Sequence, residues 1–266
     1  MGEVNAYVAL AKGQWRSVFS YRTSFAVDLL SNVLSSALDV VTVLVLFRAT
    51  RTVGGFTLAE GLLVVSLSSL SFAAADLVVG NVDHLKTYVR SGTLDAVLVR
   101  PLRALPQLLL MDLPIRKGLR VLVGLAALIV ALNLNDIPWD ASRVVLVITA
   151  PVAGAVIFGA IFVISASTAF WWIDSGEVGS AFTYGGRDFT AYPVSVYAGW
   201  FRALFAYALG FGFVAYQPAV TLLGRADPLG LPAWTGFLSP LLALVATGVA
   251  ALVWRAGIKH YRSTGS

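Results

Sequence analysis

The chain has 266 residues, of which 58% are hydrophobic and 12% are charged, with 19 basic and 14 acidic side chains. Soluble domains carry about 25% charged residues, and disordered chains combine low hydrophobicity with high net charge. The composition therefore excludes a water-soluble globule and a disordered chain. At about 20 apolar residues per crossing, it predicts an all-α polytopic membrane protein, a single transmembrane domain over residues 1–266.

Residue types that carry much of enzyme chemistry are scarce. There is no cysteine, and the two histidines are His84 and His260. Disulfides and thiolate catalysis are thus excluded, and most zinc chemistry with them. No G-x-x-x-x-G-K-[ST] loop, H-E-x-x-H pair or G-x-S-x-G elbow is present. We expect a chain that is not an enzyme by itself and binds no cofactor or metal.

The first segment, residues 4–22, places apolar side chains at helical spacing and basic ones elsewhere on the helix. Val4, Tyr7 and Trp15 mark the apolar face, and Lys12 and Arg16 lie off it. This pattern is typical of an amphipathic helix lying in the membrane surface. The alternative is an irregular end of the first span.

Apolar segments then predict six transmembrane helices. They cover, approximately, residues 24–47, 58–79, 121–134, 144–170, 193–213 and 235–253. Residues 174–192 are polar and Gly-rich, and we expect them to connect the fourth and fifth spans. Residues 214–234 are moderately apolar but interrupted by proline and glycine, which predicts an extracytoplasmic re-entrant hairpin between spans five and six.

The basic residues favour one orientation. In the six-span arrangement, fourteen lysines and arginines fall on the side of the two termini and four on the other. Lysine and arginine accumulate in loops that stay in the cytoplasm. Both termini are therefore expected in the cytoplasm.

Polar side chains follow one side of the predicted first span. They are Asp28, Asn32, Ser35, Ser36 and Asp39. Because a charged residue at mid-bilayer costs about 2.5–3.5 kcal/mol on insertion scales, such residues face protein or water and mark function. The stripe is a candidate translocation path or subunit contact. Alternatively, Asp28 lies near the membrane surface, where Arg22 neutralises it.

The longest polar interval, residues 80–120, predicts a cytoplasmic platform. Gly92 can end one short helix in the left-handed conformation, and Thr93 can cap a second that stops before Pro101. Asp95 in the first turn of this second helix complements the helix dipole. Plain connections are shorter than this interval, so we expect it to have a function of its own.

The apolar residues of the two short helices would have to be buried against another surface. Tyr88, Leu94 and Leu98 are candidate anchors, and Arg90 and Arg100 are candidate orienting charges at their rim. Packing on the membrane surface and docking of a partner protein explain this pattern equally well.

Residues 90–102, R-S-G-T-L-D-A-V-L-V-R-P-L, resemble the R-S-G-x-L-D-x-x-L-x-[KR]-P segment of the permease subunits of ATP-binding-cassette (ABC) exporters, in the type-2 membrane-domain class. The resemblance extends over nearly the whole chain, including the basic tail from Lys259 to Gly265. The acid-bearing first span departs from that pattern.

This resemblance implies a bacterial cytoplasmic-membrane permease that moves drugs, lipids or glycans outward. It implies two copies of a separate ATPase, which bind ATP and magnesium, and a second permease forming a homodimer or heterodimer. Membrane lipids are further expected partners, and nucleic acid is not. By the same resemblance the coupling helices lie within residues 84–100, where the matching positions are Tyr88, Arg90, Gly92, Thr93, Leu94, Asp95, Leu98 and Arg100.

Two other functions stay open from the residues. One is a secondary transporter or channel that uses the Asp28/Asp39 stripe as an ion or proton relay, although no Pro-broken helix pair accompanies it in matching halves of the chain. The other is an assembly subunit without a path of its own. Co-purification of an ATPase would favour the exporter.

Overall fold

The computed structural model describes residues 52–111, 117–172 and 176–261, together with scattered positions between 27 and 50. The interfacial helix predicted over residues 4–22 lies outside the described residues. So do all five members of the polar stripe, Asp28, Asn32, Ser35, Ser36 and Asp39.

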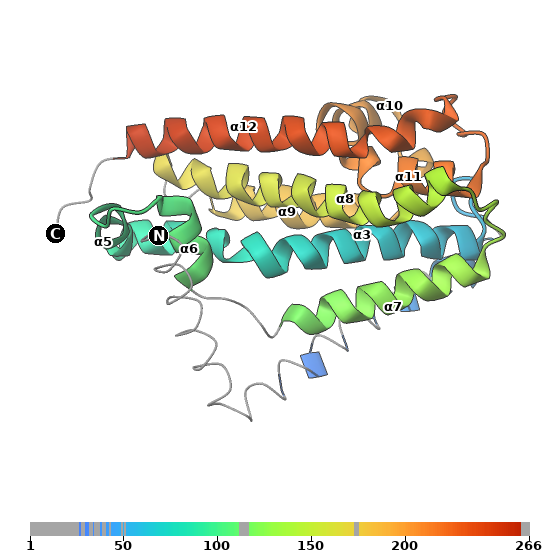
Figure 1. The fold of residues 1–266 in the computed structure, drawn as a ribbon, viewed down its shortest axis with the longest axis horizontal. Helices are drawn as coiled ribbons and strands as arrows, with labels where there is room; N and C mark the ends of the chain where they lie inside the picture. The colour runs from blue at the N-terminus through green and yellow to red at the C-terminus, as the bar shows by residue number, and fades with distance from the viewer. Residues whose placement is uncertain are drawn as a thin grey trace.

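Five helices lie side by side and form the body of the protein (Figure 1). They are α3 (Leu58–Val79), α7 (Gly118–Leu134), α8 (Ala141–Ser167), α9 (Gly176–Thr190) and α12 (Ser239–His260). Helix α3 contacts α7, α8 and α9, while α8 also contacts α12. Within the described residues the one strand-like feature is an isolated bridge between Val53 and Phe56. The predicted all-helical class is therefore confirmed.

Local sequence signals define the starts of the long helices. Thr57 caps α3, and the Glu60 carboxylate accepts a hydrogen bond from the Thr57 backbone N–H at 2.7 Å, which completes a capping box. Asp140 caps α8 by accepting from the Arg143 backbone N–H at 2.8 Å. The predicted spans 58–79, 121–134 and 144–170 thus correspond closely to helices.

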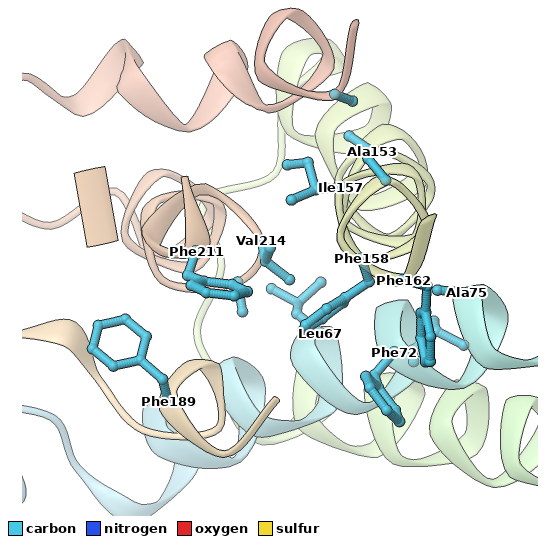
Figure 2. Packing of buried hydrophobic residues seen from close by; sticks show 14 of the residues in the cluster. Leu67, Phe72, Ala75, Ala153, Ile157, Phe158, Phe162, Phe189, Phe211 and Val214 are labelled. Carbon is cyan, nitrogen blue, oxygen red and sulfur yellow. The ribbon is translucent and has the colours of Figure 1, made fainter. Parts of the chain in front are cut away.

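Aromatic side chains fill the core between α3 and α8. Phe72 meets Phe158 edge-on with ring centroids 5.2 Å apart, and Phe162 lies 5.7 Å from Phe72 (Figure 2). Phe158 and Phe162 are both 0% exposed. Close packing of these rings holds α3 and α8 at a fixed separation.

Helix α9 corrects one expectation. Residues 174–192 were expected to be a polar connection, yet α9 runs along α8 and α3. Gly179, Thr183, Gly186 and Thr190 form its buried stripe, and the Thr190 hydroxyl lies 2.6 Å from that of Ser68 on α3. Small side chains allow helices to approach closely inside a membrane protein, so packing holds α9 where hydropathy alone would not predict a helix in the bundle.

The predicted fifth span, 193–213, is wrong as a single straight helix. It is divided among η5 (Val194–Val196), α10 (Gly199–Arg202), the π-helix η6 (Ala203–Ala208) and η7 (Phe211–Phe213). The segments 199–208 and 211–223 meet at a bend of 62°. Gly199 and Gly210 both have positive φ, which suits glycine and breaks the helix.

The chain next forms α11 (Tyr216–Leu223) and η8 (Ala233–Leu238) before α12. Ser195 donates a hydrogen bond of 2.6 Å to the Gly54 carbonyl, so this region lies beside the turn that precedes α3. We call residues 53–57 together with 194–238 the cap end of the bundle.

The opposite end carries four short elements, η1 (Gly80–His84), α4 (Leu85–Arg90), α5 (Thr93–Leu98) and α6 (Ala104–Met111). Its lysines and arginines, among the described residues, are Lys86, Arg90, Arg100, Arg103, Lys117, Arg120, Arg255 and Lys259. We call it the basic end. Helix α3 reaches it without interruption, because α3, η1 and α4 form one helical rod from Leu58 to Arg90.

Three helices among the described residues are long and apolar enough to cross a membrane, and the bent pair would be a fourth. The three lie within Leu58–Arg90, Ala141–Phe170 and Ala233–His260. Helix α7 is apolar but has 17 residues. The count of six spans stays a prediction, since the first span falls largely outside the described residues.

Candidate functional site

A tight helical hairpin, formed by α4 and α5, stands at the basic end (Figure 1). Gly92 joins the two helices with φ of 69°, in the left-handed region predicted for it. The Ser91 N–H donates to the Thr87 carbonyl at 2.9 Å, which closes α4 before the reversal. A Cβ at Gly92 would meet one atom within 4 Å, the Asp95 Oδ2 at 3.9 Å. Backbone conformation therefore favours glycine here, since space is not limiting.

Thr93 is the first residue of α5, not its cap. Gly92 occupies the cap position, and no side chain closes the helix start. The Thr93 hydroxyl instead lies 2.7 Å from the Ser91 hydroxyl. The left-handed backbone at Gly92 turns the chain directly into the helix, which leaves the Thr93 side chain to bridge back to α4.

One face of the hairpin is buried in the protein's own core. Leu85 and Leu94 are 0% exposed, Val89 is 1% exposed and Val97 is 3% exposed. The predicted anchor Leu94 is therefore wrong as a partner contact, because no partner can reach it without unfolding the hairpin. Helical spacing cannot distinguish a face turned to the chain from one turned to a partner.

The opposite face is exposed. Leu98 is 38% exposed and Val99 is 85% exposed, and the side chains of Arg90 and Arg100 lie in the exposed class as well. Val99 was not singled out from the sequence, although a valine directly before Arg100 and Pro101, past the end of α5, has no helical face to pack on. We call Arg90, Leu98, Val99 and Arg100 the hairpin surface.

Tyr88 is half-buried and belongs to the support of the hairpin. Its hydroxyl donates to Asn81 Oδ1 at 3.3 Å, and the Asn81 amide donates to the Leu108 carbonyl on α6 at 2.6 Å. The Gln107 amide donates to the carbonyls of Val97 and Leu102 at 3.3 and 3.1 Å. Helix α6 thus satisfies one carbonyl group in the last turn of α5 and one in the segment that follows it, which supports the hairpin.

Asp95 ties the hairpin to the far end of the chain. Its Oδ1 accepts a hydrogen bond of 3.1 Å from the Tyr261 hydroxyl, one residue beyond α12. The pKa of Tyr261 is raised, mainly by partial burial and to a smaller extent by this hydrogen bond to the carboxylate. The neutral phenol is the form that donates, so α5 and the end of α12 are joined at neutral pH.

A buried ion cluster lies under the hairpin, at the end of α3. Asp76, 2% exposed, accepts from Lys117 Nζ at 2.5 Å and lies 3.5 Å from Arg120 Nη1. Beside it, Tyr184 of α9 donates to Asp83 Oδ2 at 3.2 Å. These contacts connect α7 to the end of α3, and α9 to η1, directly before the hairpin.

The polar stripe of the first span lies outside the described residues, so its use as a path or contact stays a prediction. Among those that are described, no group of three or more histidine, aspartate or glutamate side chains is placed to hold a metal ion.

These features define the class: a multi-pass helical membrane protein with a structured helical hairpin at one end. A family model described as "ABC-2 family transporter protein" matches residues 33–265. The chain therefore belongs to the ABC-2 transporter family, and the predicted family resemblance is confirmed. It is a membrane permease of an ABC transporter, and this family implies partnership with an ABC ATPase subunit. The comparisons with curated proteins and with solved structures give no match.

Proposed function

We propose that this chain is one of two permease subunits of an exporter driven by two copies of a separate ABC ATPase. The second permease is a copy of this chain or a relative. The observation that carries the proposal is the hairpin surface: Leu98, Val99 and two arginines stand outward, on helices whose other face is anchored in the bundle. An exposed apolar pair rimmed by charge is a feature of protein-docking sites.

The hairpin surface is the proposed contact with the ATPase. Because α4 continues α3 as one rod from Leu58 to Arg90, a push on the hairpin would be transmitted along that helix. The ATPase would supply ATP binding and hydrolysis with magnesium, while this chain binds neither. Closing of the ATPase dimer would then tilt the spans and move the substrate outward.

We infer the orientation of the chain, in what we propose to be a bacterial cytoplasmic membrane, from its charge. Eight lysines and arginines of the described part of the chain gather at the basic end, and the positive-inside rule would place that end in the cytoplasm. The end of α12 lies there too, beside Asp95. An ATPase in the cytoplasm would meet the hairpin surface on that side, which supports a cytoplasmic C-terminus; the N-terminus on the same side remains part of the proposal.

Helix α9 offers a surface for the substrate or for the second permease. Its outward face mixes polar and apolar side chains: Val178, Ser180, Phe182 and Asp188, all exposed. Polar groups turned toward acyl chains are unfavourable, so water, substrate or a second subunit would cover this face. Its mixed character suits a lipophilic or amphipathic substrate. The Asp28/Asp39 stripe stays a candidate for the same path or contact.

The test is co-purification with the ATPase produced together with this chain. Val99→Asp should weaken co-purification and lower ATP-dependent transport in vesicles, while the amount of folded permease stays constant. Val196→Asp is the matched control, since Val196 is 47% exposed at the cap end. Equal binding by both variants would contradict the assignment of the hairpin surface.

The same vesicles separate the competing functions. Uptake into inverted vesicles that needs ATP and the ATPase supports the exporter. Transport that follows a proton gradient without the ATPase would indicate a secondary transporter, and stable assembly without transport would indicate an anchoring subunit.

A further inference from the structure

A long apolar groove lies between α7 and α12, with α3 and α8 as its floor. Figure 1 shows α12 and α7 on opposite sides of α8 and α3. The groove has a volume of about 1350 Å³, and residues of all four helices line it. It opens to the surface, because Leu125, Ile129, Ile148 and Val152 line it and are also exposed. In a multi-pass membrane protein such a surface faces the bilayer.

Small residues on the floor make the groove deep. Ala74, Ala75, Ala155, Gly159 and Ala160 line it where α3 and α8 meet. Leu125 and Ile129 on α7, and Trp254 and Ile258 on α12, are among the larger residues of its walls, so the surface is concave along the helices. A concave apolar surface of this volume can accommodate acyl chains.

One end of the groove is cationic. Arg103, before α6, and Arg255 and Lys259, in the last turns of α12, line it at the basic end, and all three are exposed. No acidic side chain of the described residues is part of the lining. Basic side chains at the level of the headgroups attract anionic lipids.

We propose that this groove binds an anionic phospholipid of the leaflet at the basic end. Its acyl chains lie over the α3–α8 floor, and its phosphate lies among Arg103, Arg255 and Lys259. The site is separate from the hairpin surface, although both border α6. Lipid binding in this groove goes beyond the proposed function, and it requires only that the bundle spans a membrane.

The position of the headgroup gives the lipid a route to the hairpin. Lys259 precedes Tyr261 by two residues, and Tyr261 is bonded to Asp95 on α5. Arg103 directly precedes α6, whose Gln107 supports the end of α5. A bound headgroup would therefore hold both supports of the hairpin in place.

The experiment measures lipid binding to the purified full chain in detergent by native mass spectrometry. Phosphatidylglycerol and phosphatidylcholine with identical acyl chains are the probes. We expect phosphatidylglycerol to bind about tenfold more tightly. Glycerol phosphate, which has the headgroup chemistry without acyl chains, should not displace it. Equal binding of the two lipids, or displacement by glycerol phosphate, would overturn the proposal.

Two variants locate the site. Arg255→Gln with Lys259→Gln should abolish the preference for phosphatidylglycerol, whereas Arg100→Gln removes a charge from the same end outside the groove and should keep it. Ala251→Trp should weaken both lipids, because Ala251 lines the groove and is exposed, so the added ring fills space without displacing a buried neighbour. An unchanged preference in the double variant, or unchanged binding in Ala251→Trp, would contradict a groove site.

Discussion

Tyr261 donates a hydrogen bond of 3.1 Å to Asp95, and this contact joins the end of α12 to the hairpin 166 residues earlier in the chain. The last long helix and the predicted coupling segment are therefore one mechanical unit at the basic end. The bond also depends on the protonation state of the phenol.

The first prediction concerns pH. The pKa of Tyr261 is raised in the folded protein above the ordinary value of about 10. A raised pKa means that this contact contributes stability below pH 10, which is lost as pH rises through the folded value. Ultraviolet difference titration of the wild type against Tyr261→Phe should show this tyrosine ionising above the ordinary range. In the Asp95→Asn variant, Tyr261 should ionise at lower pH than in the wild type. Identical titration of Tyr261 in the wild type and in Asp95→Asn would contradict the hydrogen bond.

The second prediction concerns Gly92. Its φ of 69° costs a non-glycine residue about 1–2 kcal/mol. Gly92→Val should misplace α4 and α5 and lower ATPase co-purification, whereas Gly92→Asn should be milder, because asparagine tolerates this conformation. Gly248→Val is the control: Gly248 lies on α12 with nothing within 4 Å of an added Cβ. Pull-down and thermal unfolding in detergent measure both effects, and similar losses at the two glycines would argue against a special conformation.

A third prediction tests the place of α9 in the bundle with two adjacent glycines. A Cβ at Gly186 would collide with the Phe211 ring, while one at Gly185 would meet nothing within 4 Å. Gly186→Val should lower the midpoint of thermal unfolding by several degrees, since overpacking costs about 1–3 kcal/mol. Gly185→Val should leave it nearly unchanged. If the two variants behaved alike, α9 would not pack on η7 as described.

The fourth prediction addresses the buried ion cluster. Asp76→Asn removes the carboxylate that pairs with Lys117 and Arg120, whose side chains are about one third exposed, and should destabilise the protein by about 1–3 kcal/mol. Lys117→Gln should cost less, because Arg120 still pairs with Asp76 and the lysine side chain is 31% exposed. Denaturation in detergent ranks the variants. A larger loss for Lys117→Gln would contradict the arrangement.

Sequence reasoning predicts the apolar helices well. Hydropathy identifies α3, α7, α8 and α12, because their side chains contact lipid or an apolar core and both environments select the same residues. It also predicts the reversal at Gly92, where the backbone demands glycine. These features depend on local chemistry alone.

The rest depends on tertiary contacts. Hydropathy does not identify helix α9, because its buried stripe of glycine and threonine packs on α8 and α3 through close approach and hydrogen bonds. The bend at Gly210 interrupts a segment whose composition suits a straight span. For Leu94, helical spacing shows that one face is apolar, but the partner of that face is the protein's own core.

The continuity of α3 with α4 has a consequence for how force would travel. The rod from Leu58 to Arg90 has 33 residues, so it is roughly 50 Å long. At its far end the Arg225 guanidinium reaches Glu60 at 2.8 Å and the Gly55 carbonyl at 2.9 Å, which secures α3 to the cap end. A rigid helix that is fixed at one end and pushed at the other acts as a lever, and the push is transmitted along its whole length. Its smallest movements would occur beside Glu60, and its largest at the loaded end, beside Arg90 and the hairpin.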